Sequence, residues 1–452
     1  MGERRFHTPI AVLDLWMVLN DASPTFLVGG AVRDELAGRK PKDYDLATAL
    51  LPQDVRRICE GAGYRVIPTG EKFGTMTVLA TDELPVEVTT FRRDGRYTDM
   101  RHPDTVTYAQ TIEEDLSRRD FTMNAMAIAY GGSLIDPYGG IADLRSGFLR
   151  TVGDPAERFA EDPLRMWRAV RFIAEGKAER IHEGTLAAIY RYKALTAFLS
   201  RERVRDELSR TLLGRFQHGL ILAADTGLLA MAIPEWQATV GFKQRNSHHA
   251  WAVDEHVLAV VAGAYPNTIE MKLAALLHDI AKPICFVQEP GHNAHFYDHA
   301  FVGAQMAGEI LDRLRYPKHV AQRVTTLIEH HMFPFWQAGV GGYRRMIAKV
   351  GSEVLEQLIL LHEADFQGSK PQHVGYRVRP EIRARIALAT EEVQRVEKLA
   401  IGGRDVMALL GIGPGPQVGR ALKACQEAVL EDPEANTREV LEKIVLEVGQ
   451  SA

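Results

Sequence analysis

The sequence contains little cysteine and no long hydrophobic run. Its 452 residues include three cysteines, Cys59, Cys285 and Cys425, which lie far apart along the chain. So few thiols exclude a disulfide framework and a cysteine-rich zinc site, and they are typical of a reducing compartment. No apolar stretch approaches the roughly 20 residues of a membrane-spanning helix, and the N-terminus fits neither a secretory signal nor the myristoylation pattern. These absences predict a cytoplasmic protein without a membrane partner.

An excess of positive charge is also lacking, because the formal net charge is −5. Any contact with nucleic acid must therefore come from local basic patches. The content of 46% hydrophobic and 25% charged residues is ordinary for a globular protein, and the length suffices for about two to four domains.

The pattern of the chain changes near residue 150. Before it, an apolar run at 26–28 ends in two glycines, residues 43–46 alternate polar and apolar, and β-rich runs at 75–80 and 86–91 flank a turn-like TDELP, which predicts a hairpin. After Gly153, leucine, alanine, arginine and glutamate dominate. We therefore predict an α+β head with a mixed sheet and helices, followed by an all-α neck, body and tail, at 1–150, 151–245, 246–375 and 376–452.

A pair of glycines and a pair of aspartates form the first candidate site. Gly29 and Gly30 lie at a strand-to-helix turn, where backbone N–H groups can approach a triphosphate. Arg33 can bind phosphate oxygens with both arms of its guanidinium. Asp43 and Asp45, two residues apart on a strand, point to the same side and suit two Mg²⁺ ions.

A third carboxylate is usually needed for such a metal pair, and Glu87 is the best candidate. It is the lone acid of a β-run and faces away from Val86 and Val88. The alternative is a turn with two solvated aspartates. The spacing of nine residues between the GGxVRD and DxD patterns disfavours that alternative.

Residues 29–48 closely resemble the signature of the class II tRNA nucleotidyltransferase and bacterial poly(A) polymerase family, within the polymerase-β-like superfamily. Four further stretches resemble the family's later motifs in the same order. By this resemblance, 118–125 contacts ribose and phosphate through Arg119, Asp120 and Asn124, 136–144 is a flexible spring, 161–165 reads the nucleobase, 201–208 is the fifth motif, and 91–99 is a flexible loop.

The base-reading motif also has a chemical logic of its own. Asp162 followed by Pro163 predicts the start of a helix, on which Arg165, Arg168 and Arg171 recur every three residues. Cytosine and adenine share an amino group beside a ring nitrogen that accepts a hydrogen bond, so an aspartate and an arginine can select both. We interpret Asp162 and Arg165 as this selecting pair, with Arg168 and Arg171 holding base or triphosphate. The alternative is a helix cap followed by ordinary surface arginines.

Histidines concentrate in the third predicted part, where residues 246–375 hold twelve of the sixteen. Histidine and aspartate at helix ends suit one or two divalent transition metals that activate water. The order of these residues resembles the HD phosphohydrolase superfamily, with His299 and His331 as further ligands beside the core set of His256, His278, Asp279 and Asp365. The alternatives are satisfied core histidines, or a domain that mainly contacts RNA.

Two more regions are candidates for RNA contact. Basic residues that could line a backbone-binding surface are Arg191, Lys193, Arg201, Arg203, Arg205, Arg210 and Arg215. Interleaved acids make a solvated helix face an equal alternative. The Gly/Pro-rich segment 411–419 fits either a phosphate contact or an interhelical turn, and the resemblance to a family tail that grips the tRNA elbow favours RNA.

The resemblance implies an Mg²⁺-dependent enzyme that adds C and A to the 3′ end of tRNA from CTP and ATP without a template and releases pyrophosphate. Rival activities are poly(A) polymerase and CC-only or A-only addition. CC-only members typically lack the loop, so its presence at 91–99 favours full CCA or A addition. A rival of another class is an HD metal-dependent phosphohydrolase with a nucleotide-sensing head. The acidic balance and the intact acid pair disfavour a non-catalytic RNA-binding module.

Overall fold

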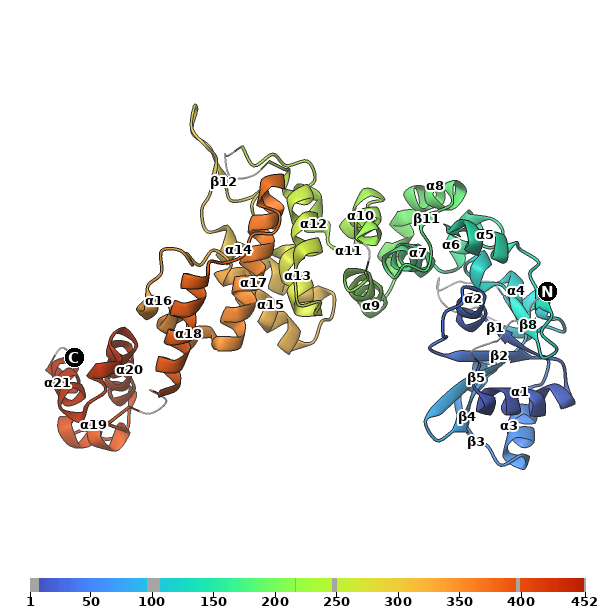
Figure 1. Ribbon diagram of the computed structural model, residues 1–452, viewed down its shortest axis with the longest axis horizontal. Helices are drawn as coiled ribbons and strands as arrows, with labels where there is room; N and C mark the ends of the chain where they lie inside the picture. The colour runs from blue at the N-terminus through green and yellow to red at the C-terminus, as the bar shows by residue number, and fades with distance from the viewer. Residues whose placement is uncertain (1–7, 96–105, 216, 246–249, 396–398, 451–452) are drawn as a thin grey trace. The chain divides into compact units, whose positions relative to one another are not determined.

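The computed structural model of this chain describes residues 8–95, 106–215, 217–245, 250–395 and 399–450. The chain divides into two units, Met1–Pro234 and Glu235–Ala452, which run from blue to light green and from yellow-green to red in Figure 1. The finer division into four parts stays a prediction.

A seven-stranded mixed sheet organises the first part of unit one. Its spatial order is β3-β4-β5-β2-β1-β8-β9, and β2 and β5 are parallel whereas all other neighbours are antiparallel. The strands are β1 (Thr25–Val28), β2 (Tyr44–Thr48), β3 (Arg65–Gly70), β4 (Thr75–Thr81), β5 (Leu84–Thr90), β8 (Ala127–Ala129) and β9 (Leu134–Ile135). The hairpin predicted around TDELP is β4–β5.

The alternation of side chains along each strand gives the sheet two different faces. On one face, Leu46, Val86 and Val88 pack with residues of α1 (Ile10–Ala22) and α3 (Pro52–Gly61) in the larger core (Figure 1). On the other face a smaller core forms around Val28 and Ala47. The odd-numbered residues of β2 and β5 therefore point away from α1 and α3.

The remainder of unit one is short strands and helices. Two-stranded pairs are formed by β6 (Arg92–Asp94) with β7 (Val106–Tyr108), and by β10 (Phe148–Leu149) with β11 (Arg180–Ile181). The helices are α2 (Gly30–Leu36), α4 (Ile112–Ser117), α5 (Gly140–Ser146), α6 (Pro155–Glu161), α7 (Leu164–Ala174), α8 (Glu183–Tyr192), α9 (Arg201–Leu212), α10 (His218–Asp225) and α11 (Leu228–Ala232), with 3₁₀ turns η1 (Glu71–Phe73), η2 (Thr122–Asn124) and η3 (Lys193–Phe198).

In the described residues of unit two the regular structure is helical apart from one pair of two-residue strands, β12 (Phe286–Val287) and β13 (His295–Phe296). Its helices are α12 (Val253–Gly263), α13 (Ile269–Leu277), α14 (His299–Arg313), α15 (Lys318–His330), α16 (Val340–Val350), α17 (Ser352–Ser369), α18 (Pro380–Arg395), α19 (Gly403–Leu410), α20 (Pro416–Glu431) and α21 (Arg438–Gln450), with 3₁₀ turns η4 (Pro234–Ala238), η5 (Pro371–His373) and η6 (Pro433–Ala435). The last three helices enclose a core of their own around Cys425.

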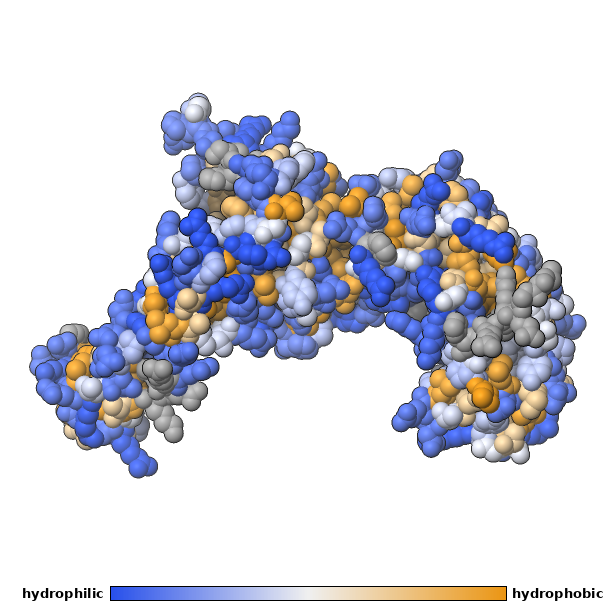
Figure 2. Space-filling model, in the orientation of Figure 1, coloured by the Kyte–Doolittle hydropathy of each residue, from blue (hydrophilic) through white to orange (hydrophobic). Residues whose placement is uncertain are grey.

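The predicted class, an α+β head followed by helices, is confirmed. Among the described residues, every helix is too short or too polar to span a bilayer. On the face drawn in Figure 2, hydrophilic residues cover most of the surface and hydrophobic ones form scattered patches.

Candidate functional site

Two of the three predicted acids stand side by side on neighbouring strands. Asp45 on β2 is the register partner of Glu87 on the parallel strand β5. Asp45 precedes the core residue Leu46 on β2, and Glu87 lies between the core residues Val86 and Val88 on β5. Because side chains alternate along a strand, both carboxylates face away from α1 and α3. Asp43 departs from the expectation, because it lies in the exposed bend just before β2 rather than within the strand.

The three carboxylates affect one another electrostatically. Burial, together with the negative charges of Glu87 and Asp43, raises the pKa of Asp45 to about 6, against an opposing effect of Arg119. Carboxylate oxygens are the donors that a divalent cation such as Mg²⁺ prefers, and such a cation would relieve the repulsion that raises the pKa of Asp45. The residues therefore fit a metal of that class.

Gly29 brings the turn between β1 and α2 against this cluster. Its backbone has φ +71° and ψ −135°, a conformation that is open essentially to glycine alone. A Cβ at Gly29 would lie 3.1 Å from Arg119 Nη1 and 3.3 Å from Asp45 Oδ2. The absence of a side chain thus leaves space at the point where the turn, the carboxylate and the guanidinium meet.

Two hydrogen bonds and one ion pair join four of the predicted nucleotide-binding residues. Arg33 Nη1 donates to Asn124 Oδ1 at 2.8 Å, and Asn124 Nδ2 donates to Asp120 Oδ1 at 2.9 Å. Asp120 Oδ2 lies 2.6 Å from Arg168 Nη2. The structure therefore brings Arg33, Asp120, Asn124 and Arg168 together, although they come from three separate motifs.

The predicted base-reading pair lies where α6 meets α7. Asp162 caps α7 as predicted, because its Oδ1 accepts the N–H of Leu164 at 3.1 Å, and α7 runs from Leu164. Asp162 also directly follows α6. The other oxygen of Asp162 lies 2.9 Å from Arg203 Nη2. Arg165 donates to Glu161 at 2.6 Å and to the carbonyl of Arg118 at 2.9 Å. Both side chains would have to exchange these partners to bind a base.

Arg171 occupies a different environment from the other arginines of α7. It is buried, its Nε donates to Glu207 of α9, and its Nη1 donates to Glu175 at 3.0 Å. Its predicted contact with base or triphosphate stays untested. The geometry supports a structural contact between α7 and α9.

The sequence analysis did not predict three ion pairs that the site residues make. Asp115 pairs with Arg119 at 3.0 Å, Arg203 with Asp162, and Glu207 with Arg171. The last two lie in the fifth motif, so their position there was the available clue. The predicted loop at 91–99 extends beyond the described residues, which show only its start, where β6 pairs with β7.

The six predicted histidines and aspartates of unit two converge. They form two groups, and within each group the possible ligand atoms lie within 4.8 Å of one another. One group is His256, His278 and Asp365, and the other is Asp279, His299 and His331. The groups adjoin, since His256 Nε2 lies 3.0 Å from Asp365 Oδ1 and 3.4 Å from Asp279 Oδ2. The nearby His295 is exposed and belongs to neither group.

The orientation of these histidines suits metal binding. Nδ1 of His278, of His299 and of His331 lies 2.7–2.9 Å from a backbone carbonyl, which can only accept, so Nδ1 is the donor and Nε2 is the nitrogen left to bind a metal. Burial and the neighbouring His278 lower the pKa of His331 to about 3. Within the described chain, the buried His299 Nε2 has no hydrogen-bond partner. These nitrogen and oxygen donors fit one or two divalent transition metals.

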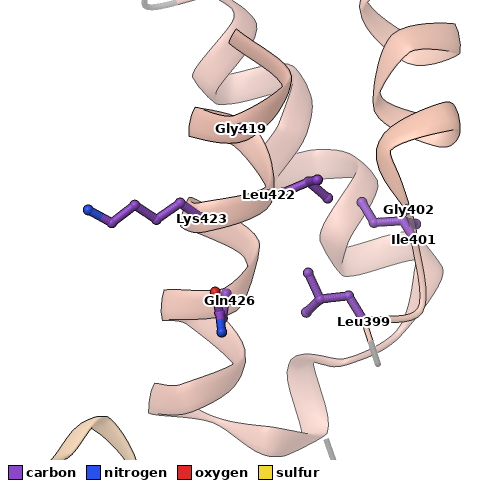
Figure 3. A pocket seen from close by; sticks show the side chains of 7 residues that line it. All are labelled: Leu399, Ile401, Gly402, Gly419, Leu422, Lys423 and Gln426. Atoms are coloured by element: carbon purple, nitrogen blue, oxygen red, sulfur yellow. The ribbon is translucent and has the colours of Figure 1, made fainter. Parts of the chain in front are cut away.

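Four of the seven basic RNA-contact candidates lie on α9. Three of these four, Arg203, Arg205 and Arg210, pair with acids. The segment between α19 and α20 is an interhelical turn with Pro416 at the first position of α20. A pocket of the same region is lined by apolar side chains such as Leu399 and Leu422, and the ammonium of Lys423 points away from it (Figure 3). Its lining residues include no acid or histidine, so we assign it no catalytic role.

Three family models match the chain. They are the poly A polymerase head domain at 25–150, the probable RNA and SrmB-binding site of polymerase A at 180–239, and the HD domain at 249–366. The HD match contains all six ligands of unit two, and the head match contains the three acids.

Individual relatives agree with these models. An A-adding tRNA nucleotidyltransferase of Deinococcus radiodurans is 32% identical over 416 residues, which are 89% of this chain and 90% of that protein. A CCA-adding enzyme of Geobacillus stearothermophilus is 40% identical over 58% of this chain and 69% of its own. The crystal structure of the Bacillus stearothermophilus CCA-adding enzyme with CTP is 29% identical, covers 98% of both chains and has a TM-score of 0.69.

Proposed function

Because the chain belongs to the class II tRNA nucleotidyltransferase family, we propose that it completes the 3′ end of tRNA by adding C and A from CTP and ATP with release of pyrophosphate. The observation that carries this proposal is the pairing of Asp45 and Glu87 on neighbouring strands, directly beside the glycine turn at Gly29. Carboxylates beside a glycine turn, whose backbone N–H groups a phosphate can approach, are what a metal-bound triphosphate requires.

The family implies dependence on a divalent metal, and we propose Mg²⁺ because the ligands are carboxylates. Asp45 and Glu87 would hold it, with Asp43 reaching in from the bend. Bound there, Mg²⁺ would lower the pKa of the RNA 3′-hydroxyl and neutralise charge on the triphosphate. No side-chain nucleophile is needed.

The remaining residues bind and orient the nucleotide in this proposal. The backbone N–H groups at Gly29 and Gly30 approach the phosphates, and Arg33, Arg119 and Arg168 supply positive charge beside them. Asn124 holds Arg33 in place by a hydrogen bond, and Asp120 holds Arg168 in place by an ion pair. A hydrogen bond between Asn124 and Asp120 links the two. Asp162 and Arg165 select C and A once they release Arg203 and Glu161.

A direct assay tests the proposal. Purified protein is incubated with tRNAs that end before the first C, before the second C, or before the A, each with labelled CTP or ATP. We expect incorporation of C into the first two and of A into the third, with no further extension. Failure to incorporate either nucleotide into any of the three tRNAs contradicts the proposal.

A-only addition is the second candidate, favoured by the relative that matches over most of both chains. In the same assay, an A-only enzyme labels only the tRNA that already ends in CC. A poly(A) polymerase instead extends it by many residues.

For unit two we propose a metal-dependent phosphohydrolase centre at the two ligand groups. The nitrogen and oxygen donors of these six residues support it.

We further propose that neck, body and tail correspond to 151–245, 246–375 and 376–452. In this proposal the basic residues and the tail contact tRNA, and the protein is cytoplasmic.

A further inference from the structure

Asp115 is a buried acid of α4 that the nucleotidyl-transfer chemistry does not itself use. Its side chain is 1% exposed, and each oxygen takes a different guanidinium, Arg118 Nη2 at 2.7 Å and Arg119 Nη2 at 3.0 Å. Burial alone would disfavour the ionised carboxyl, but Arg119 and Arg118 outweigh it and lower the pKa of Asp115. Asp115 therefore carries a negative charge beneath the two arginines.

The other arm of Arg119 faces the carboxylate cluster. Its Nη1 lies 3.1 Å from the point that a Cβ of Gly29 would occupy, and Asp45 Oδ2 lies 3.3 Å from that same point. Arg119 Nη1 also donates to the carbonyl of Asn124 at 3.5 Å. Arg119 and Asp45 are thus neighbours at the Gly29 turn.

An arginine beside two acids tends to form a paired contact with one of them. If Arg119 turned onto Asp45, it would occupy a proposed metal ligand and withdraw its own charge from the phosphates. The pairing with Asp115 opposes that movement, because the buried carboxylate would lose one of its two charged partners and keep only Arg118.

We propose that Asp115 is a positioning residue, which holds Arg119 so that one arm of the guanidinium is offered to the nucleotide's phosphates instead of closing onto Asp45. The proposal rests on the function proposed above. Its geometry is specific to Asp115 among the acids of α4, since Glu114 pairs with Arg93 of the β6 strand and Glu113 is exposed.

The test compares binding of CTP and of ATP at equilibrium, with Mg²⁺ and without tRNA, for wild type, Asp115→Asn, Arg119→Met and the double variant. Because both nucleotides carry the same triphosphate, we expect Asp115→Asn to raise both Kd values by a similar factor of about ten. In the Arg119→Met background the same change should have no further effect. Glu113→Gln removes an acid from the same helix and should bind as wild type does.

A Kd of folded Asp115→Asn within a factor of two of wild type, even with a lower Tm, would mean a purely structural residue and overturn the proposal, as would additive effects in the double variant. If Asp115→Asn does not fold, Asp115→Glu decides the matter. It keeps the charge but shifts the guanidinium, so we expect affinity between wild type and Asp115→Asn, and wild-type affinity overturns the proposal. Because binding is measured without tRNA, a wild type that binds CTP but extends no tRNA contradicts only the proposed function.

Discussion

Asp45 and Glu87 hold like charges side by side at the strand pair β2–β5. Proteins retain such arrangements mainly at functional sites, because repulsion and burial make them unfavourable for folding. Their position beside the glycine turn supports the proposal that this cluster is the catalytic site of unit one.

Asp45→Asn should separate activity from stability. We expect incorporation of labelled CTP and ATP into tRNA to fall by about 100-fold or more, because a ligand charge is lost. The thermal midpoint in metal-free buffer should stay the same or rise, since the change also removes repulsion with Glu87. A variant that unfolds earlier while retaining activity would contradict this role.

Gly29→Ala should lower both the stability and the activity of the protein. At φ +71° and ψ −135° we expect a cost of roughly 1–3 kcal/mol in the free energy of unfolding, and the added Cβ would press on Arg119 and Asp45. Gly38→Ala is the matched control, because it also has positive φ but its Cβ would meet nothing within 4 Å. Urea denaturation should show a lower free energy of unfolding for both variants. The tRNA assay should show lost activity for Gly29→Ala alone.

Among the secondary-structure elements, α7 connects the head to the following helices through its arginines. Each arginine is held by an acid from a different part of unit one: Arg165 by Glu161, Arg168 by Asp120, and Arg171 by Glu207. Ion pairs of this kind orient the helix, and the buried pair with Glu207 fixes α7 against α9.

Glu207→Gln should weaken that contact. Removing one partner of a buried pair leaves Arg171 with Glu175 alone, so we expect a loss of about 2 kcal/mol in the free energy of unfolding. Glu202→Gln lies on the same helix at an exposed position and should stay within about 0.5 kcal/mol of wild type. Equal urea midpoints for the two variants would contradict a contribution of the buried pair.

On the scale of the whole molecule, each of the two units contains one cluster of candidate ligands. The carboxylates Asp45 and Glu87 belong to Met1–Pro234, and the six histidines and aspartates belong to Glu235–Ala452. Because each cluster is complete within its own unit, the two proposed activities should be separable.

Crossed variants test this separation. His278→Ala should abolish metal-dependent hydrolysis of a phosphate ester and leave nucleotide incorporation within about twofold of wild type, whereas Asp45→Asn should do the reverse. His295→Ala, an exposed histidine outside both ligand groups, serves as the control and should retain both activities. Loss of incorporation in folded His278→Ala would show that the units are coupled.

Local patterns were enough to predict much of this protein. Alternation along 75–91 predicted the β4–β5 hairpin and the outward direction of Glu87, and the loss of strand patterns after Gly153 predicted the helical remainder. Such features follow from the sequence because backbone conformation and side-chain alternation depend on neighbouring residues. The six residues that meet in unit two were indicated by the resemblance to the HD superfamily instead.

Packing between distant elements decided the rest. The sequence placed Asp43 on the strand, whereas the structure puts it in a bend just before β2. Nothing in the sequence indicated that Arg171 pairs with Glu207 or that Asp115 pairs with Arg119. The partner of a buried charge is chosen by which helices come together in three dimensions, and the spacing of residues along the chain does not encode that choice.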